Sequence, residues 1–290
     1  MLYIDAFSLT SNVNEWLANS RHPRILHVFD HTCNLINEHG DVLSVVTSGI
    51  GDGPFNLVVG SDISFFRNLT AQTPISIRKD QLNLGDLTID TAEAKLWNPR
   101  PDWESLHAKK DEIFNQLKSL QIASYANSGL DTGFATSAQP DLTTNLESIT
   151  SKFSYAIANA DFSSAKTIAS QLAGLGIGLT PAGDDYLMGA IYATWIIKPI
   201  KTATNLAREI AESAAPLTTS LSAALLRSAG RGEAGILWHK FFDVLPAGED
   251  IELPITKLIA VGETSGADAL AGFISTFISY LESEAKLCHS

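Results

Sequence analysis

The chain has 290 residues, 45% of them hydrophobic, which is enough apolar material for one large domain or two ordinary ones with their own cores. Its 32 acidic residues outnumber 20 basic ones, giving a net charge of -12. This negative charge opposes binding to nucleic acid or to an anionic membrane surface, so neither is expected as a partner.

The cysteine content and the apolar stretches indicate a cytoplasmic protein. Cys33 and Cys288 are the only cysteines, and they form neither a disulfide framework nor a zinc-ligand pattern. The opening MLYIDAFSLTSNVNEW has no basic leader and no long apolar run, which argues against a secretory signal. The most apolar stretches, 186–200 and 269–281, are shorter than the roughly 20 residues of a membrane helix and are expected to be buried core helices.

From residue 23 to about residue 97, short apolar or alternating runs are separated by turn residues, a pattern typical of strands. The segment NEHGD carries the glycine of a tight hairpin, and IGDGPF marks a further turn. We predict a small antiparallel sheet or barrel. The expected strands are RILHVF, CNLIN, DVLSVVT, FNLVVG, PISIR and LTID.

After Pro101 the apolar period becomes helical, and WESLHAKKDEIFNQLKSL is the first predicted helix. Residues 123–140 are rich in Ser, Gly and Ala and are expected to form a long loop or lid. The predicted fold is α+β, with a mainly antiparallel β domain over 1–100 and a mainly α-helical domain over 101–290. Further helices are expected at 142–159, 161–173, 182–197, 202–214, 217–229, 233–244 and 266–285.

The segment GLGIGLTPAGDDYLMG, residues 174–189, predicts a glycine-rich helix entrance. Thr180 is a good N-cap, and Pro181 suits the first helical position. Gly183 then falls in the first turn, where glycine costs about 1 kcal/mol relative to alanine. Close approach of a ligand to the helix N-terminus would justify that cost, because free N–H groups and the helix dipole favour an anion. A purely structural interpretation, close packing of a loop or helix, stays open.

A second segment, VGETSGADALAGF at residues 261–273, matches GLTPAGDDYLMGA when one gap is allowed. Two helix starts of the same composition suggest a paired site in which both N-termini meet one ligand. The matched pairs are Gly178 with Gly262, Thr180 with Thr264, Gly183 with Gly266, Asp185 with Asp268, Leu187 with Leu270 and Gly189 with Gly272.

Other phosphate-binding motifs do not fit these residues. A P-loop needs Gly-Lys-Ser or Gly-Lys-Thr after its glycines, and a dinucleotide fingerprint needs a preceding strand and the spacing GxGxxG. Asp184 and Asp185 are compatible with Mg²⁺, but adjacent helical residues point about 100 degrees apart, so at most one would be a direct ligand. No metal site or cofactor is predicted, although Mg²⁺ stays an alternative.

Two further groups of polar residues are candidates for the site. Thr218 or Thr219 would cap the next helix, with Ser222 one turn onward, either as plain capping or as a third polar helix start facing the anion. His31 and Asn34 fall at a bend between two predicted strands, where a neutral histidine could transfer a proton. The predicted catalytic residues are Asp185, Asp268 and His31; the predicted substrate-binding residues are Gly176, Gly178, Thr180, Gly183, Asp184, Thr218, Thr219, Ser222, Thr264, Ser265, Gly266 and Asn34.

GLGIGLTPAGDDYLMG, PLTTSLSAALLRSAGRGEAG and GETSGADALAGF together resemble the AllH-type subunit family of oxamate carbamoyltransferase. HTCNLINEHGDVLSVV and GPFNLVVG resemble its N-terminal part, so the resemblance runs from about residue 27 to about residue 277. It implies a role, with partner subunits, in allantoin breakdown, where oxalurate and phosphate give oxamate and carbamoyl phosphate. Glu263 departs from the histidine expected in relatives, and a carboxylate there is unfavourable beside an anion.

Three functions follow from these features. The first is a carbamoyltransferase, or a subunit of one, that binds phosphate, carbamoyl phosphate, oxamate or oxalurate, with backbone N–H groups stabilising the developing charge. The second is a non-catalytic anion-binding or assembly subunit. The third, a metal-dependent hydrolase, requires Asp184, Asp185 and Asp268 to share an ion. Covalent hydrolysis lacks support because no GxSxG elbow is present.

Overall fold

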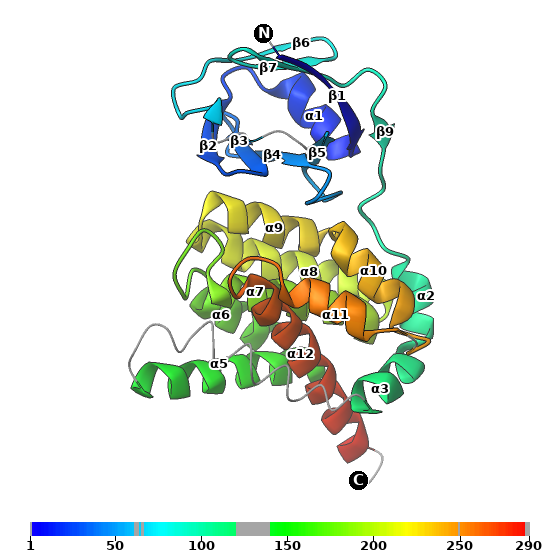
Figure 1. Cartoon of the computed structure of the whole chain (residues 1–290). Coiled ribbons are helices and arrows are strands. Elements are labelled where there is room, and N and C mark those ends of the chain that lie inside the picture. The colour runs from blue at the N-terminus through cyan, green and yellow to red at the C-terminus, as the bar shows by residue number, and fades with distance from the viewer. Residues whose placement is uncertain (1, 61–63, 65–66, 120–139, 249, 288–290) are drawn as a thin grey trace. The chain divides into compact units, whose positions relative to one another are not determined.

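The computed structural model describes residues 2–60, 64, 67–119, 140–248 and 250–287 (Figure 1). The chain divides into two compact units. The N-terminal unit comprises residues 1–99 with 234–236, and the helical unit comprises 100–233 and 237–290. A strand-rich first part followed by helices confirms the predicted α+β class. The loop predicted at 123–140 lies almost entirely outside the described residues.

The N-terminal unit is a curved, nearly closed sheet in the order β2-β3-β4-β5-β1-β8-β7-β6, with β9 paired to β1 (Figure 1). Most neighbours are antiparallel, whereas β4–β5, β1–β8 and β1–β9 are parallel. The strands are β1 (Leu2–Leu9), β2 (Arg24–Val28), β3 (Thr32–Ile36), β4 (Val42–Thr47), β5 (Asn56–Val59), β6 (Ile75–Arg78), β7 (Gln81–Leu84), β8 (Leu87–Asp90) and β9 (Lys95–Leu96).

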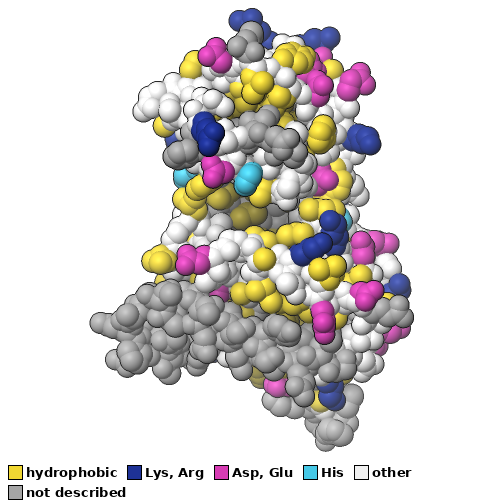
Figure 2. Space-filling model, viewed as in Figure 1, with side chains coloured by type: hydrophobic (Ala, Val, Ile, Leu, Met, Phe, Trp, Pro, Cys, Tyr) yellow, Lys and Arg dark blue, Asp and Glu magenta, His cyan; other side chains and the backbone are white. Residues whose placement is uncertain are grey.

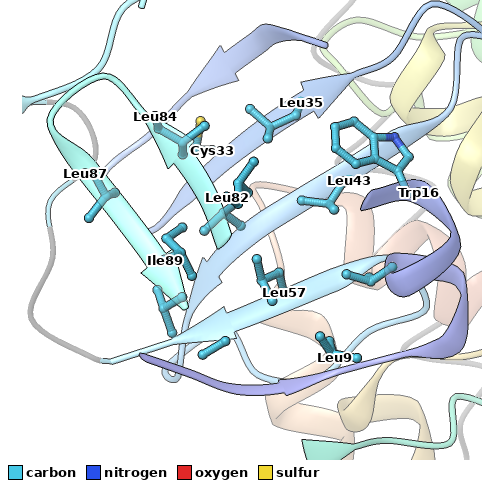
Figure 3. Close-up of a cluster of buried hydrophobic side chains, with 14 of the residues drawn as sticks. Leu9, Trp16, Cys33, Leu35, Leu43, Leu57, Leu82, Leu84, Leu87 and Ile89 are labelled. Carbon is cyan, nitrogen blue, oxygen red and sulfur yellow. The ribbon is translucent and has the colours of Figure 1, made fainter. Parts of the chain in front are cut away.

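All six predicted strands form, and the NEHGD hairpin joins β3 to β4 with Gly40 at a φ of 86°. The strands β1, β7 and β9 were not predicted, nor was the helix α1 (Ser11–Asn19). Thr10 begins α1 because its hydroxyl accepts a hydrogen bond from the Val13 N–H and donates one to the Pro54 carbonyl. Figure 3 shows the apolar side chains gathered on the inner side of the sheet, with Trp16 of α1 beside them.

Every predicted helix has a counterpart in the helical unit. The first predicted helix is broken at Lys109 into two, and one helix after residue 250 was not predicted. The helices are α2 (Trp103–Ala108), α3 (Lys110–Ser119), α5 (Pro140–Ala158), α6 (Phe162–Leu172), α7 (Ala182–Ile197), α8 (Ile200–Ala214), the 3-10 turn η3 (Ala215–Leu217), α9 (Ser220–Gly230), α10 (Ile236–Val244), α11 (Glu252–Ile259) and α12 (Ser265–Leu287).

Helix α7 is the centre of this unit, since every residue of it except Met188 is buried. Such a helix is apolar on all sides, as the run YLMGAIYATWII requires. It packs most extensively against α12, and α8, α9 and α2 contact its other faces. Among the described residues, no helix is both long enough and apolar enough to span a bilayer.

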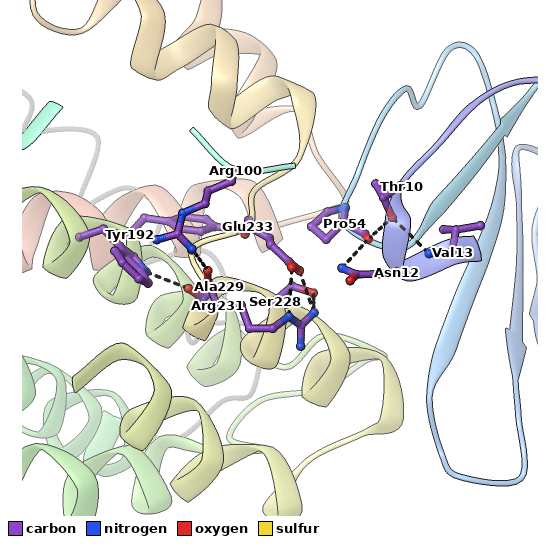
Figure 4. Close-up of polar contacts among 12 residues, drawn as sticks. Thr10, Asn12, Val13, Pro54, Arg100, Tyr192, Ser228, Ala229, Arg231 and Glu233 are labelled. Atoms are coloured by element: carbon purple, nitrogen blue, oxygen red, sulfur yellow. Dashed lines mark hydrogen bonds and ion pairs between the residues drawn. The ribbon is translucent and has the colours of Figure 1, made fainter. Parts of the chain in front are cut away.

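The C-terminal end of α9 is fixed by side chains that donate to its carbonyl groups, as Figure 4 shows in part. A helix end leaves carbonyl groups that need partners, and these side chains satisfy carbonyl groups at the end of α9 and just after it. The hydrogen bonds run from Trp195 to Ala229, from Arg100 to Arg231, from Trp103 to Gly232 and from Tyr192 to Glu233.

Candidate functional site

Three segments that are distant in sequence meet at one end of the helical unit. They are the loop between α6 and α7, the turn from η3 into α9, and the start of α12. The Thr180 and Ser265 hydroxyl oxygens lie 2.7 Å apart. The Thr219 hydroxyl donates to the Leu179 carbonyl at 2.6 Å, and the buried Ser222 hydroxyl also donates to that carbonyl. The structure therefore brings together the predicted residues of all three helix starts.

The loop before α7 has an unusual backbone. Gly174, Gly176 and Gly178 have φ values of 72°, 117° and 99°, while Leu175 and Ile177 between them do not have positive φ. Left-handed residues within a turn are a feature of the concave N–H arrangements that bind anions. The three glycines and Ile177 are exposed. Only glycine adopts such φ values without strain, so the GLGIG spacing determines the loop's shape.

The N–H groups of this loop are available to a ligand. Among the described residues, none accepts a hydrogen bond from the backbone N–H groups of residues 176–180. In the first turn of α7, by contrast, the Gly183 N–H donates to the Leu175 carbonyl at 2.9 Å. The N–H groups of Asp184 and Asp185 both donate to Pro181. Among the described residues, the donors without an acceptor at this helix start are therefore those of the loop and the Ala182 N–H, the first of α7.

Two details of the predicted helix start are wrong. Pro181, not Thr180, occupies the N-cap position of α7, and it provides no side-chain cap. The Thr180 hydroxyl is directed instead to Ser265 of α12. By contrast, Thr219 caps α9 as predicted, since its hydroxyl oxygen accepts a hydrogen bond from the Ser222 N–H at 3.1 Å.

Gly183 and Gly266 are explained by backbone packing. A Cβ atom at Gly183 would lie 2.1 Å from the Leu172 carbonyl oxygen, and one at Gly266 would lie 1.7 Å from that of Leu258. Either distance is far inside contact range, so no larger residue fits without movement of the backbone. Close packing against a neighbouring backbone therefore explains these two glycines. Close approach of a ligand is a better explanation for the exposed glycines of the loop.

The partial sequence repeat has a counterpart in the crossing of α7 and α12. A Cβ at Gly189 would lie 1.7 Å from the Ala269 carbonyl oxygen, and one at Gly272 would lie 2.0 Å from that of Tyr186. Tyr186 and Ala269 are themselves equivalent positions in the repeat, being three residues before Gly189 and Gly272. Gly189 of α7 therefore approaches Ala269 of α12, and Gly272 of α12 approaches Tyr186, the equivalent residue of α7. The two helices cross with local two-fold pseudosymmetry.

The turns before these helices are also alike, but they differ in length. The Gly183 N–H donates to Leu175 and the Gly266 N–H donates to Val261. Eight residues separate the first pair and five separate the second, so the first loop carries three extra residues. The predicted single gap is therefore too short. The equivalence of Thr180 with Thr264 stays a prediction.

Asp184 holds the loop to its neighbours. One of its carboxylate oxygens accepts the Gly174 N–H at 2.9 Å, and the other accepts the Thr218 hydroxyl. Burial raises the pKa of Asp184, and the hydrogen bonds from Thr218 and Gly174 oppose that rise. Both carboxylate oxygens have partners, so the role of Asp184 in the structure is to position the loop and the start of α9.

Asp185 and Asp268 are buried carboxylates without sufficient partners. Asp185 is 3% exposed and Asp268 is fully buried. Neither oxygen of Asp268 has a hydrogen-bond partner among the described residues, and Oδ2 of Asp185 has none there either. Burial raises the pKa of Asp185 well above its usual value, the Ser265 hydroxyl opposes this, and the charge of Asp268 adds to it. Burial raises the pKa of Asp268 to about 7, against an opposing contribution from Thr264.

The two remaining predicted residues lie in the N-terminal unit. His31 is exposed at the bend between β2 and β3. Asn34 is 3% exposed within β3, and its side-chain oxygen accepts the Ser44 hydroxyl at 2.6 Å. Asn34 is thus occupied within the sheet, and a contribution of either residue to the helical site stays a prediction.

Sequence reasoning missed the Leu179 carbonyl, which accepts the Thr219 and Ser222 hydroxyls, and the Gly174 N–H, which binds Asp184. Backbone groups give no signal in residue type. Within the part of the chain that the structure describes, no three His, Cys, Asp or Glu side chains form a metal-binding group.

These features define a two-unit protein whose helical unit is built on two pseudosymmetric crossing helices beneath a glycine-rich loop. Residues 172–277 match the family model of AllH, described as oxamate carbamoyltransferase subunit AllH, and residues 4–96 match the AllH family N-terminal domain. The chain therefore belongs to the AllH family, which confirms the resemblance in the sequence. The first match encloses the loop, the three helix starts and both unpartnered carboxylates. No solved structure matches the chain.

Proposed function

We propose that this chain is a subunit of a carbamoyltransferase and that its 174–180 loop binds the anionic group of the substrate. The observation that carries this proposal is the alternating backbone at Gly174, Gly176 and Gly178, with the N–H groups of 176–180 left without described acceptors. The family description, oxamate carbamoyltransferase subunit, supplies the reaction class.

The loop is better suited to binding a small oxyanion than to binding a charged surface of another protein. Figure 2 shows Lys and Arg side chains as small separate groups, with acidic side chains spread between them. With a net charge of -12, the chain gives little long-range attraction to anions, so a site must rely on local donors. Backbone N–H groups act at hydrogen-bond distance and bind phosphate or carboxylate without a basic side chain. The Thr180 and Ser265 hydroxyls, beside the loop, would orient the bound group.

In the proposed reaction, a phosphate oxygen forms a bond to the carbamoyl carbon of oxalurate. The bond from that carbon to the oxamate nitrogen breaks, and this nitrogen takes a proton. Negative charge moves from the attacking phosphate oxygen to the carbamoyl oxygen and then to the departing nitrogen, which takes the proton that hydrogen phosphate gives up. Preorganised N–H donors stabilise such charge because they need no reorientation during the reaction. The loop would thus contribute both substrate binding and charge stabilisation.

A titration of the full chain tests this proposal. Isothermal calorimetry with phosphate, carbamoyl phosphate and oxamate should show binding by the wild type. Gly178→Ala is the decisive variant, because no atom lies within 4 Å of the added Cβ and the change acts through φ alone. Holding alanine at such a φ costs about 1–3 kcal/mol. The affinity should therefore fall about tenfold or more, since 1.4 kcal/mol corresponds to a factor of ten.

Gly40→Ala is the matched control, since Gly40 also has positive φ and open space around its Cβ but lies in the β3–β4 turn. It should leave the affinity for anions unchanged. Absence of binding by the wild type, or equal losses in both variants, would contradict the anion site. An assay for carbamoyl transfer, run with partner subunits, then separates the two functions: binding without any contribution to turnover would favour the non-catalytic anion-binding subunit.

A further inference from the structure

The two carboxylates without partners lie at the crossing of α7 and α12. A buried carboxylate is strongly disfavoured unless it is paired, hydrogen-bonded or bound to a cation. Asp185 and Asp268 leave three buried oxygens without a partner among the described residues. None of the ion pairs among the described residues involves Asp185 or Asp268. Within the described residues, the fold thus buries two carboxyl groups and pairs neither with a basic side chain.

Their positions are equivalent in the pseudosymmetric pair. Asp185 lies four residues before Gly189, and Asp268 lies four residues before Gly272. Residues at this spacing share one helix face, so each carboxylate is on the face that forms the crossing. The charge of Asp268 contributes to the raised pKa of Asp185, which agrees with this proximity. Both halves of the repeat therefore direct the same group to the same place.

Hydroxyl groups at the two helix starts act on the pair. The Thr180 and Ser265 hydroxyls, 2.7 Å apart, join the starts of the two helices, and both lower the pKa of Asp185. The Thr264 hydroxyl lowers the pKa of Asp268. All these groups would bind a metal through oxygen. Such donors suit hard cations, whereas zinc and softer metals favour nitrogen and sulfur.

We propose that Asp185 and Asp268 together bind one divalent cation of the Mg²⁺ or Mn²⁺ class at the crossing of α7 and α12. Two carboxylates neutralise a divalent ion, which removes the charge imbalance of the buried pair. The ion would also tie the two helix starts together, since one ligand comes from each. This site is independent of the loop N–H groups, and it involves Asp185 and Asp268 without Asp184, whose oxygens already have partners.

Manganese binding by the full chain tests the proposal. The purified protein is treated with EDTA, exchanged into metal-free buffer at pH 7.5 without phosphate, and titrated with Mn²⁺ while free Mn²⁺ is followed by electron paramagnetic resonance. We expect one Mn²⁺ per chain, displaced by excess Mg²⁺. Asp268→Asn and Asp185→Asn should each weaken binding about tenfold or more, because even loss of an outer partner of a metal ligand costs 10–100-fold.

Glu263→Gln is the matched control, because it removes an exposed carboxylate just before α12. It should bind Mn²⁺ like the wild type. Thermal unfolding of each protein with and without Mn²⁺ gives a second readout: the melting temperature should rise with Mn²⁺ in the wild type and in Glu263→Gln only. The wild-type titration remains decisive if an Asp variant fails to fold.

No stoichiometric Mn²⁺ in the wild type, or unchanged affinity in folded Asp268→Asn and Asp185→Asn, would overturn the proposal and leave the pair as protonated carboxyl groups. Because these measurements use neither phosphate nor turnover, their failure is distinguishable from failure of the anion site.

Discussion

The hydroxyl of Thr180, before α7, forms a hydrogen bond at 2.7 Å with the hydroxyl of Ser265, the first residue of α12. Eighty-five residues separate them in the sequence. This contact connects the two pseudosymmetric helix starts directly, and both hydroxyls also lower the pKa of Asp185. The two halves of the repeat are therefore joined by side chains as well as by the packed glycines.

A double-mutant cycle should measure this connection. Thr180→Val and Ser265→Ala each remove one hydroxyl and leave the other without its partner. A typical intramolecular hydrogen bond contributes about 0.5–1.5 kcal/mol, so we expect a coupling energy of that order in urea unfolding. Additive effects of the two changes would show that the contact contributes nothing to stability.

The glycine crossing should tolerate no added methyl group. Gly189→Ala and Gly272→Ala would each place a Cβ within 2.0 Å of a carbonyl oxygen on the other helix. Overpacking of this kind costs about 1–3 kcal/mol or more, which exceeds the gain from the better helix propensity of alanine. Urea unfolding should therefore show a lower midpoint in both variants. Stability equal to or above that of the wild type would show that the helices separate easily at this point.

Sequence patterns identified most elements because each has its own local signal. The alternating run DVLSVVT and the buried run YLMGAIYATWII could be recognised without tertiary context. The two-residue β9 carries too few residues for a period, and it exists through its pairing with β1. The strand β7 is as long as β5, β6 and β8 and alternates buried with half-buried residues, so its signal was present and was missed.

For the candidate site too, some contacts could be predicted from the sequence and others could not. The repeat predicted that Asp185 and Asp268 are equivalent, and residue types indicated the Thr219 cap. The partner of the Thr180 hydroxyl depends on the packing of α7 against α12, which no local pattern encodes. The hydrogen bond from the Gly183 N–H to the Leu175 carbonyl likewise depends on a three-residue difference in loop length, which the sequence match did not show.

Thr219 should be important for both the helix and the loop. Thr219→Ala removes the cap of α9, worth about 1 kcal/mol, and also the hydrogen bond to the Leu179 carbonyl. We expect a loss of about 1–2 kcal/mol in unfolding free energy together with weaker phosphate binding, because the loop loses an anchor. Thr204→Ala is the control, since the exposed Thr204 only donates to Ile200 in its own helix. If Thr219→Ala lowered stability but left phosphate affinity at the wild-type value, the loop would not depend on this anchor.

The buried pair should give the metal-free protein a characteristic dependence of stability on pH. The folded-state pKa of Asp268 is about 7, above the value of about 3.9 in an unfolded chain, so the folded state binds the proton more tightly between these values. Stability must then fall as the pH rises from about 4 to about 7, by up to roughly 1.4 kcal/mol per unit, and level off above that range. The raised pKa of Asp185 acts in the same direction.

Urea unfolding in EDTA at pH 5 and pH 7.5 would measure this change in stability. Asp268→Asn should show a smaller difference between the two pH values, because it has no proton to lose at this position. Since other carboxylates titrate in both proteins, the comparison isolates Asp268. Equal differences in wild type and variant would mean that Asp268 is ionised in the folded chain throughout this range.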